Sequence, residues 1–234
     1  PRWGHWLLLL LLPLAPVAGL GAPFDPAEKA AALARAGGAG RPYAVDVGSR
    51  VITPGLQKPV PFHAGRAAVY LQFERPLTGA ERGELTRNGV RFFAPISPNT
   101  YLARIRENTL NALRGQGLLR GIEPVEPADK LTEALFKGTV GRHAWNPDGT
   151  WSVHVRFYED VALDLALAVL DAAGAQPEDR SRFLFNQRLL ARVTATQVSL
   201  LAEDPAVASV EEVPPPPKTM NAQSAQISGV NVLQ

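Results

Sequence analysis

The chain contains no cysteine among its 234 residues and only one methionine. Without cysteine it can form no disulfide, thiolate metal site or cysteine nucleophile, and cysteine usage does not reveal its redox compartment. Phosphate-binding glycine loops, the G-x-S-x-G turn and the H-E-x-x-H motif are absent as well. Of the four histidines, His143 and His154 have no nearby acidic residue or metal-ligand spacing, and His5 and His63 lie in the N-terminal stretches. The sequence therefore predicts no catalytic residue, cofactor or metal site in this chain.

A concentrated basic surface is also missing. The 24 basic and 22 acidic residues are scattered together and give a net charge of +2. Binding to a phosphate backbone needs a clustered basic face, so we expect no nucleic-acid partner. The segments "TYLARI" and "LLARVT" also lack the paired aromatic residues with which RNA-recognition domains stack bases.

The N-terminus carries the features of an export signal. Arg2 precedes the unbroken run Leu7 to Leu12, which is too short to cross a bilayer and is followed by small residues. Residues 1–21 are therefore predicted to be a signal peptide, cleaved after Gly19-Leu20-Gly21. The mature protein would be secreted, in the periplasm or outside the cell, and no stable membrane anchor would remain. The missing initiating Met indicates a fragment.

Residues 22–65 are rich in Ala, Gly and Pro. This composition predicts a flexible leader with at most one short helix over 27–35 and no core of its own.

Residues 66–130 have the pattern of a first folded unit. Val69, Leu71 and Phe73 alternate with polar positions, which predicts a strand with one buried face. Thr78 and Glu81 form a capping box that opens a helix, and Asn88-Gly89 ends it. Further elements are predicted as strands over 90–94 and 101–105, a helix that Asn108 caps, and a strand over 118–125.

Residues 151–213 repeat this order. A strand through Val153 is followed by a helix over 161–173 that Asp160 caps, and Phe183, Phe185 and residues 189–193 are predicted to form a central hairpin. A helix over 197–202 and a strand over 207–213 complete the unit. The expected fold class is α+β, with two tandem ferredoxin-like βαββαβ domains, each an antiparallel sheet with two helices on one face.

The repetition can be checked by subtraction. Leu190 and Leu102 differ by 190 − 102 = 88, and this offset gives seven identities in a 26-residue window without a gap. About two are expected from ordinary composition. The identical pairs are Leu102/Leu190, Ala103/Ala191, Arg104/Arg192, Leu113/Leu201, Glu123/Glu211, Val125/Val213 and Pro127/Pro215. Duplication is therefore the favoured interpretation, although any two βαββαβ units share some alternation.

Residues 131–150 connect the units. Asn146-Pro147-Asp148-Gly149 predicts a turn between a strand over 136–145 and the strand that starts at Trp151, and this hairpin would add an edge strand to the second sheet. A calcium loop is the less favoured reading of this turn, because most of its ligand pattern is missing.

The chain resembles the N-terminal pro-region of secreted bacterial subtilisin-family serine proteases. The resemblance rests on "RAAVYLQFERPLTGAERGELTRNGVRFFAPISPNTYLARI", on the last strand "DPAVASVEEV" followed by "PPPP", and on "NAQSAQISGVNVLQ", and it covers about Val51 to Gln234. None of the catalytic Asp, His and Ser motifs of that family is present. Two tandem units also exceed the single inhibitor domain that is usual there.

The resemblance implies a function as intramolecular chaperone and inhibitor. The sheet of the second unit would pack on two helices of the catalytic domain, a partner in cis, and the segment Val213 to Asn221 would lie in its substrate cleft. Glu211 and Glu212 would cap the N-termini of the enzyme's helices, or would serve only solubility. The interface residues implied are Glu211, Glu212, Val213, Pro214, Pro215, Lys218, Thr219 and Met220.

An alternative function is an exported tandem binding module for a peptide, a carbohydrate or a cell-surface partner. Residues 214–234 have the composition of a proline-rich linker toward a missing catalytic domain, and the two hypotheses differ in the sequence expected after them. A complete binding module should end soon after its last strand, whereas a pro-region should continue into a catalytic domain.

Overall fold

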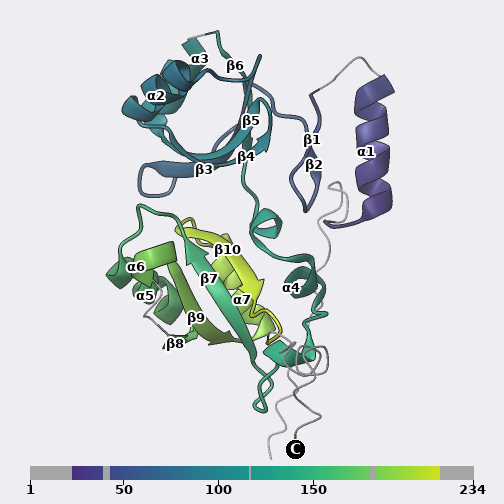
Figure 1. The fold of residues 1–234 in the computed structure, drawn as a ribbon, viewed down its shortest axis with the longest axis vertical. Helices are drawn as coiled ribbons and strands as arrows, with labels where there is room; N and C mark the ends of the chain where they lie inside the picture. The colour runs from purple at the N-terminus through teal and green to yellow at the C-terminus, as the bar shows by residue number, and fades with distance from the viewer. Residues whose placement is uncertain (1–22, 39–42, 116, 180–182, 217–234) are drawn as a thin grey trace, which may run out of the picture.

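The computed structural model describes residues 23–38, 43–115, 117–179 and 183–216. The fold is α+β and contains two four-stranded antiparallel sheets (Figure 1). The predicted signal peptide, residues 1–21, lies outside the described residues. The described helices are all too short or too polar to cross a membrane.

The elements follow one another in this order: α1 (Pro26–Gly38), β1 (Val45–Asp46), β2 (Val51–Ile52), β3 (Arg66–Phe73), α2 (Gly79–Arg87), β4 (Arg91–Ser97), β5 (Thr100–Arg106), α3 (Glu107–Gly115), β6 (Leu119–Pro124), the 3-10 turn η1 (Pro127–Lys130), α4 (Glu133–Lys137), the 3-10 turn η2 (Arg142–Ala144), β7 (Trp151–Phe157), α5 (Leu163–Ala172), β8 (Gln176–Asp179), α6 (Phe183–Asn186), β9 (Arg188–Val193), α7 (Ala195–Glu203) and β10 (Val207–Glu212).

The two sheets have the same strand order. The first sheet runs β4-β5-β3-β6 and the second runs β10-β7-β9-β8. Counted along the chain within each unit, the first order is 2-3-1-4 and the second, 4-1-3-2, is the same order read from the other edge. In each unit two helices pack their apolar residues against one face of the sheet, α2 and α3 in the first and α5 and α7 in the second. Each unit therefore has its own core.

The offset of 88 also relates the elements. Adding 88 to α3, residues 107–115, gives 195–203, which are the bounds of α7. Adding 88 to β6, residues 119–124, gives 207–212, which are the bounds of β10. The second half of each unit therefore has matching lengths of strand and helix, and this match supports the duplication inferred from the identities.

The predicted capping box is confirmed at α2, and the predicted cap of α3 was wrong. The Thr78 side chain accepts from the Glu81 backbone N–H, and the Glu81 side chain accepts from the backbone N–H of Thr78. Asn88 ends α2, and Gly89 has a φ of 95°, which favours glycine. Asn108 does not precede α3, because the helix already begins at Glu107.

Two predictions in the second unit were wrong. Asp160 does not cap α5, which begins at Leu163 after Ala162. Its carboxylate instead binds two arginines of the first unit. Phe183 lies in the short helix α6, and the strand that pairs with β9 is β8. Apolar residues in so short a segment have no period that separates helix from strand. The buried Phe183 was therefore wrongly predicted to lie in a strand.

The predicted edge strand over 136–145 was also wrong, although its turn was right. The segment 133–144 forms α4 and η2, and a single bridge joins Trp145 to Trp151. The turn is closed by the N–H of Asn146, which donates to the Thr150 carbonyl at 2.8 Å. The apolar residues Leu135, Val140 and Ala144 enter the core of the second unit, so the segment packs on the sheet without extending it.

Residues 43–65 differ most from the sequence expectation, which placed them in a leader without a core. Val45 and Ile52, in the two-stranded hairpin of β1 and β2, are buried against Tyr70 of β3. The side-chain amide of Gln72 donates to the Tyr43 carbonyl at 3.0 Å. Strand β3 is therefore buried on both faces, and the hairpin lies beside the first sheet in Figure 1.

Candidate docking surface

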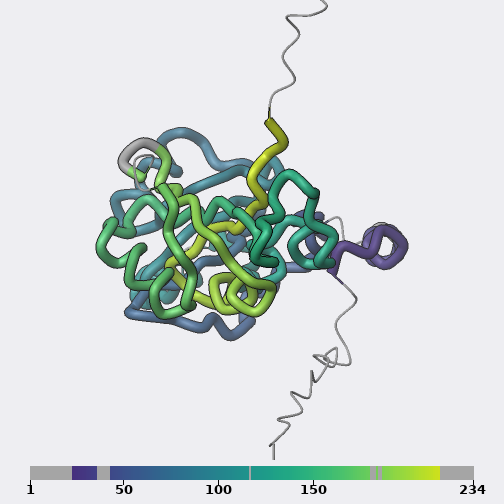
Figure 2. Tube along the Cα trace, turned by 90° about the horizontal axis from the view of Figure 1, so that it is seen from below, coloured from purple at the N-terminus to yellow at the C-terminus, as the bar shows by residue number. Residues whose placement is uncertain are grey.

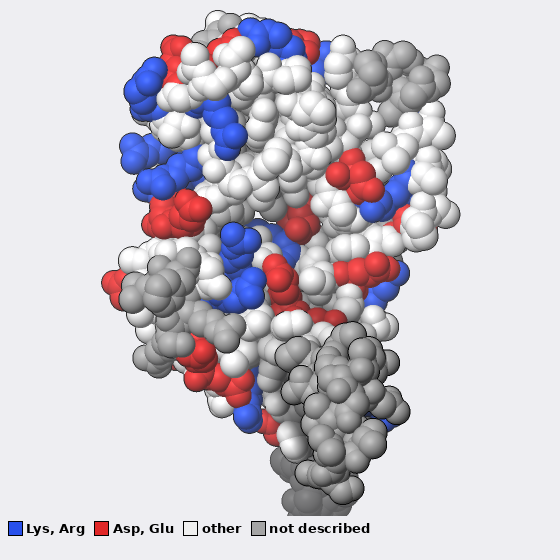
Figure 3. Space-filling model, in the orientation of Figure 1, with Lys and Arg blue, Asp and Glu red and all other residues white. Residues whose placement is uncertain are grey.

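The face of the second sheet that points away from α5 and α7, which we call the outer face, is open as far as the described residues are concerned. In β7 the core residues Val153 and Val155 alternate with Ser152, His154 and Arg156. These three pair across the sheet with residues of β9, in the order Arg192, Leu190 and Arg188. All six side chains are exposed or half-exposed. The lower half of Figure 3, where this sheet lies, shows basic and acidic side chains close together.

The chain leaves this sheet at its edge strand. Beyond β10 the N–H of Val213 still donates to the Ser152 carbonyl at 3.2 Å, so the pairing with β7 extends by one residue. Pro214, Pro215 and Pro216 are exposed. Figure 2 shows this end of the described chain running away from the body of the molecule. Three of the residues implied by the resemblance, Lys218, Thr219 and Met220, lie outside the described residues.

The two acidic residues at the end of β10 have different surroundings. The Glu212 carboxylate accepts the backbone N–H of Gly141 at 3.0 Å, so it already fixes the connecting segment. Glu211 lies on the outer face opposite His154, and its carboxylate accepts only the Ser209 hydroxyl, at 2.8 Å, among the contacts of the described residues. Of the pair, Glu211 is therefore the carboxylate that faces outward and has oxygen atoms to spare.

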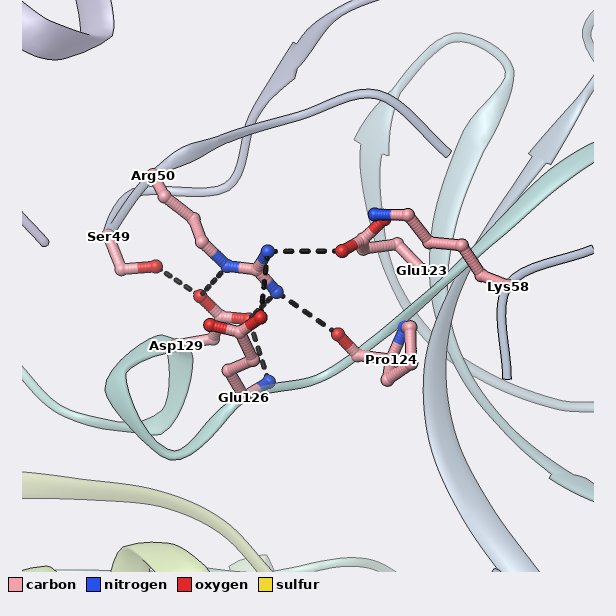
Figure 4. Close-up of polar contacts among 7 residues, drawn as sticks. All are labelled: Ser49, Arg50, Lys58, Glu123, Pro124, Glu126 and Asp129. Carbon is pink, nitrogen blue, oxygen red and sulfur yellow. Dashed lines mark hydrogen bonds and ion pairs between the residues drawn. The ribbon is translucent and has the colours of Figure 1, made fainter. Parts of the chain in front are cut away.

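The outer face of the first sheet is covered instead. Arg50, which directly precedes β2, reaches over β6 into a cluster of carboxylates (Figure 4). Its guanidinium donates to Glu123 at 3.1 Å and to both oxygens of Asp129 at 3.1 and 3.2 Å. It also lies 3.1 Å from Glu126.

The cluster includes further contacts and is largely buried. Lys58 pairs with Glu123, and the hydroxyl of Ser49 donates to Asp129. The side chain of Glu123 is 4% exposed and that of Asp129 is 0% exposed. Burial opposes the charge of Arg50, but its hydrogen bonds and attraction to Asp129 outweigh that effect and raise its pKa. Burial raises the pKa of Glu126. This cluster fixes the N-terminal hairpin to the first sheet.

The offset of 88 residues relates a position on one of these faces to a position on the other. Glu123 plus 88 is Glu211, so the residue that Arg50 and Lys58 bind in the first unit has its equivalent on the open face of the second. The sequence comparison found this pair of positions. It did not show that Glu123 is paired and Glu211 is not, because the covering residues Arg50 and Lys58 lie in a stretch with no strong periodicity.

The loop between β7 and α5 of the second unit also covers part of the first sheet. The Asp160 carboxylate lies between Arg66 of β3 and Arg104 of β5 and pairs with both. The Arg104 guanidinium stacks over the ring of Tyr158 at 4.7 Å, and that ring contacts Phe93 of β4 at 4.8 Å. Arg104 is only 8% exposed, and burial lowers its pKa.

A buried lysine lies at the same joint. Lys130, the last residue of η1, is 6% exposed, and its ammonium donates to the Asp204 carbonyl at 2.7 Å. Burial lowers the pKa of Lys130 to about 8, and burial raises the pKa of Tyr158 to about 12. The joint between the units therefore holds charged and apolar contacts away from water.

The described residues contain no group of His, Asp and Glu side chains placed to hold a metal ion. The described residues bring together a polar sheet face, an outward carboxylate at its edge and an exposed exit segment.

Comparisons with known proteins add one match. Residues 21–126 match a family model described as "Domain of unknown function (DUF8729)". The match covers less than half of the chain, and it takes in the N-terminal hairpin together with the whole first sheet. No curated protein and no solved structure matches the chain.

Proposed function

We propose that this chain is the pro-region of a secreted subtilisin-like serine endopeptidase, and that it acts as intramolecular chaperone and inhibitor by docking on the catalytic domain. The observation that carries the proposal is the open face of the second sheet, whose edge strand β10 passes directly into exposed Pro214, Pro215 and Pro216. The catalytic domain would then meet a docking sheet and the segment that follows it at the same place.

The proposed architecture is two tandem ferredoxin-like domains, residues 66–130 and 151–213. Three observations support it: the common strand order, the two helices on one face of each sheet, and the elements that coincide at an offset of 88. The N-terminal hairpin of β1 and β2 is an addition to the first of these domains.

The physical advantage of such a docked sheet lies in folding. A subtilisin-like domain builds a parallel sheet from distant segments, and loop closure must precede the stabilising contacts, so unaided folding is slow. A preformed sheet that binds the folding intermediate stabilises the slow arrangement. After folding, the stiff proline segment holds the tail extended, which favours its lying in the substrate cleft.

Within this proposal Glu211 is the interface carboxylate and Glu212 is not. The Glu212 carboxylate already accepts a hydrogen bond from the Gly141 N–H, whereas Glu211 faces outward at the edge of the open face. Backbone N–H groups at a helix N-terminus attract an anion, so Glu211 would cap one helix of the catalytic domain. The first unit would not dock in this way, because its matching face is closed by Arg50 and Lys58.

The first experiment is to read the encoding DNA beyond the codon for Gln234. We expect an open frame with Asp, His and Ser motifs in subtilisin order. A stop codon near Gln234 would overturn a role in cis and would leave the exported binding module or a separate inhibitor. Export itself is tested by fusing residues 1–21 to a reporter that is active only outside the cytoplasm.

The second experiment measures inhibition in trans. The 234-residue chain is added to the purified catalytic domain, and we expect slow, tight inhibition. Replacing Glu211 by Gln should weaken inhibition about two- to tenfold, the range of a helix-terminus charge interaction. Glu203→Gln is the matched control, because Glu203 is exposed at the end of α7 and in no ion pair among the described residues. Equal inhibition constants for the two variants would remove Glu211 from the interface.

A further inference from the structure

Two arginines on the open face lie directly opposite one another, and no described residue provides a counter-ion for them. Arg156 of β7 and Arg188 of β9 are cross-strand partners on the two central strands of the second sheet, at one end of their pairing. Arg156 is exposed, and the half-buried Arg188 has an Nε atom that is shielded from water without a hydrogen-bond partner. Neither side chain takes part in an ion pair within the part of the chain that the structure describes. Like charges directly opposite in a sheet are destabilising, so the charges of this pair are unfavourable in the chain without a partner.

No acidic side chain of the described residues neutralises the pair in the structure. The 22 acidic residues of the chain all lie in the described part, since residues 1–22, 39–42, 116, 180–182 and 217–234 contain no Asp or Glu. None of the described acids pairs with Arg156 or Arg188. The two guanidinium groups are therefore available to a carboxylate of a partner.

The first unit shows how such a pair is used. Arg66 and Arg104 stand on β3 and β5, the two central strands of the first sheet, and their guanidinium groups hold the Asp160 carboxylate of the other unit between them. Arg156 and Arg188 stand on the corresponding central strands, β7 and β9, toward the opposite end of the strand pair. The molecule thus already contains one carboxylate held by two arginines at a unit interface.

We infer that Arg156 and Arg188 are an anion site that takes an aspartate or glutamate side chain of a docked protein partner. A polyanion such as nucleic acid is disfavoured, because Glu211 lies on the same face and Glu178 and Asp148 flank the neighbouring Arg192. A face of mixed sign selects a protein surface with matching single charges. Under the proposed function, on which this identification of the partner rests, the carboxylate belongs to the catalytic domain.

The test begins with the full chain and a defined probe. Acetyl-Gly-Asp-Gly-Asp-Gly-amide is titrated into isotope-labelled protein at low salt, and the side-chain Nε–H resonances are followed by NMR. We expect the Arg156 and Arg188 signals to shift while that of Arg87, an exposed arginine of α2, stays in place. No shift, or the same shift with the peptide in which both Asp are Asn, would overturn the inference.

Variants then separate charge from fold. Arg156→Glu combined with Arg188→Glu should abolish the response to the Asp peptide, whereas Arg87→Glu should keep it. Arg188→Gln, which removes the repulsion and adds no charge, should reduce the response while the backbone spectrum stays that of the folded chain. An unchanged response in the double reversal would overturn the inference.

The partner is tested with the catalytic domain whose nucleophilic serine is replaced by Ala. Charge reversal at Arg156 and Arg188 should weaken its binding at least about tenfold, since a charge left unpaired in an interface is costly. If the wild-type chain binds this domain and the reversal changes nothing, the inference fails and the proposed function stands. If the wild-type chain does not bind it but responds to the Asp peptide, the proposed function fails and the anion site stands. Binding of a duplex DNA at near-physiological salt that the reversal abolishes would overturn the choice of a protein partner.

Discussion

The two units share a strand order but differ in the segments that lie over their outer faces. On the first sheet the N-terminal hairpin and the loop between β7 and α5 of the second unit cover the outer face, and Glu123, Arg66 and Arg104 are all paired there. On the second sheet the outer face is open, and Glu211 and Arg156 have no ionic partner among the described residues. In the first unit, the outer face of the sheet therefore serves as an internal interface, and under the proposed function the second unit uses the same face for its partner.

The contacts on the covered face of the first sheet also bear on the open face of the second. Its contacts display the kind of chemistry that the outer face of this fold accepts: an extended segment with apolar residues, a cation over the glutamate of the fourth strand and a carboxylate between arginines of the central strands. The open face carries the same types of side chain at related places. It is therefore suited to a polypeptide partner with charges of both signs.

The largest expected effect comes from breaking the joint between the units. Replacing Asp160 by Ala leaves the buried Arg104 without its carboxylate, and should lower the free energy of unfolding by about 3–5 kcal/mol. Urea unfolding followed by circular dichroism measures this. Glu159→Ala, at the exposed neighbouring residue, is the control and should cost less than about 0.5 kcal/mol. Equal losses in the two variants would show that the joint contributes no stability.

The next effect comes from uncovering the first sheet. Replacing Arg50 by Met leaves Glu123 and Asp129 buried without their common cation, and should lower the free energy of unfolding by about 2–3 kcal/mol. Limited proteolysis should also cut residues 43–65 faster than in the wild type, because the hairpin loses its attachment. The exposed Arg87→Met serves as the control. Unaltered cleavage rates in Arg50→Met would mean that apolar contacts alone hold the hairpin.

Lys130 gives the joint a pH dependence of defined sign. Its folded pKa, about 8, is below the ordinary 10.5, so the folded state binds fewer protons than the unfolded state between these values. Stability should therefore rise as the pH increases from about 8 to about 10, by on the order of 2 kcal/mol. Tyr158 acts in the opposite direction but only at higher pH, since burial raises its pKa to about 12. Lys130→Met should remove the rise, and a rise that persists in this variant would assign it to another group.

Sequence patterns predicted the elements whose signals are local. The Thr78–Glu81 capping box, the Asn146–Gly149 turn and the alternation of Val153 and Val155 all depend on residues within a few positions of one another. The α+β class and the antiparallel sheets followed from the order of these signals. The offset of 88, found from residue identities, also relates the bounds of α3 to those of α7 and the bounds of β6 to those of β10.

The failures concern contacts between distant residues. Asp160 has the residue type and the position of a helix cap, and only the first sheet, 56 residues earlier at Arg104, diverts it into an ion pair. Arg50 is separated from Asp129 by 79 residues, so no local pattern could reveal that residues 43–65 cover a sheet. The open face of the second sheet could be located from the alternation alone, but its contrast with a covered first face required the tertiary structure.

The smallest expected effect compares the stability of the two units at helix caps of the same kind. Thr78 and Thr194 each accept the backbone N–H three residues later, from Glu81 and Gln197, and each opens a helix of nine residues. Replacement of either threonine by Ala should cost about 1 kcal/mol, because both remove the same capping hydrogen bond. The two losses are compared by urea unfolding of the full chain. A loss that is several-fold larger at Thr194 would show that the second unit, whose outer face lacks a cover, is the one whose unfolding limits the stability of the molecule.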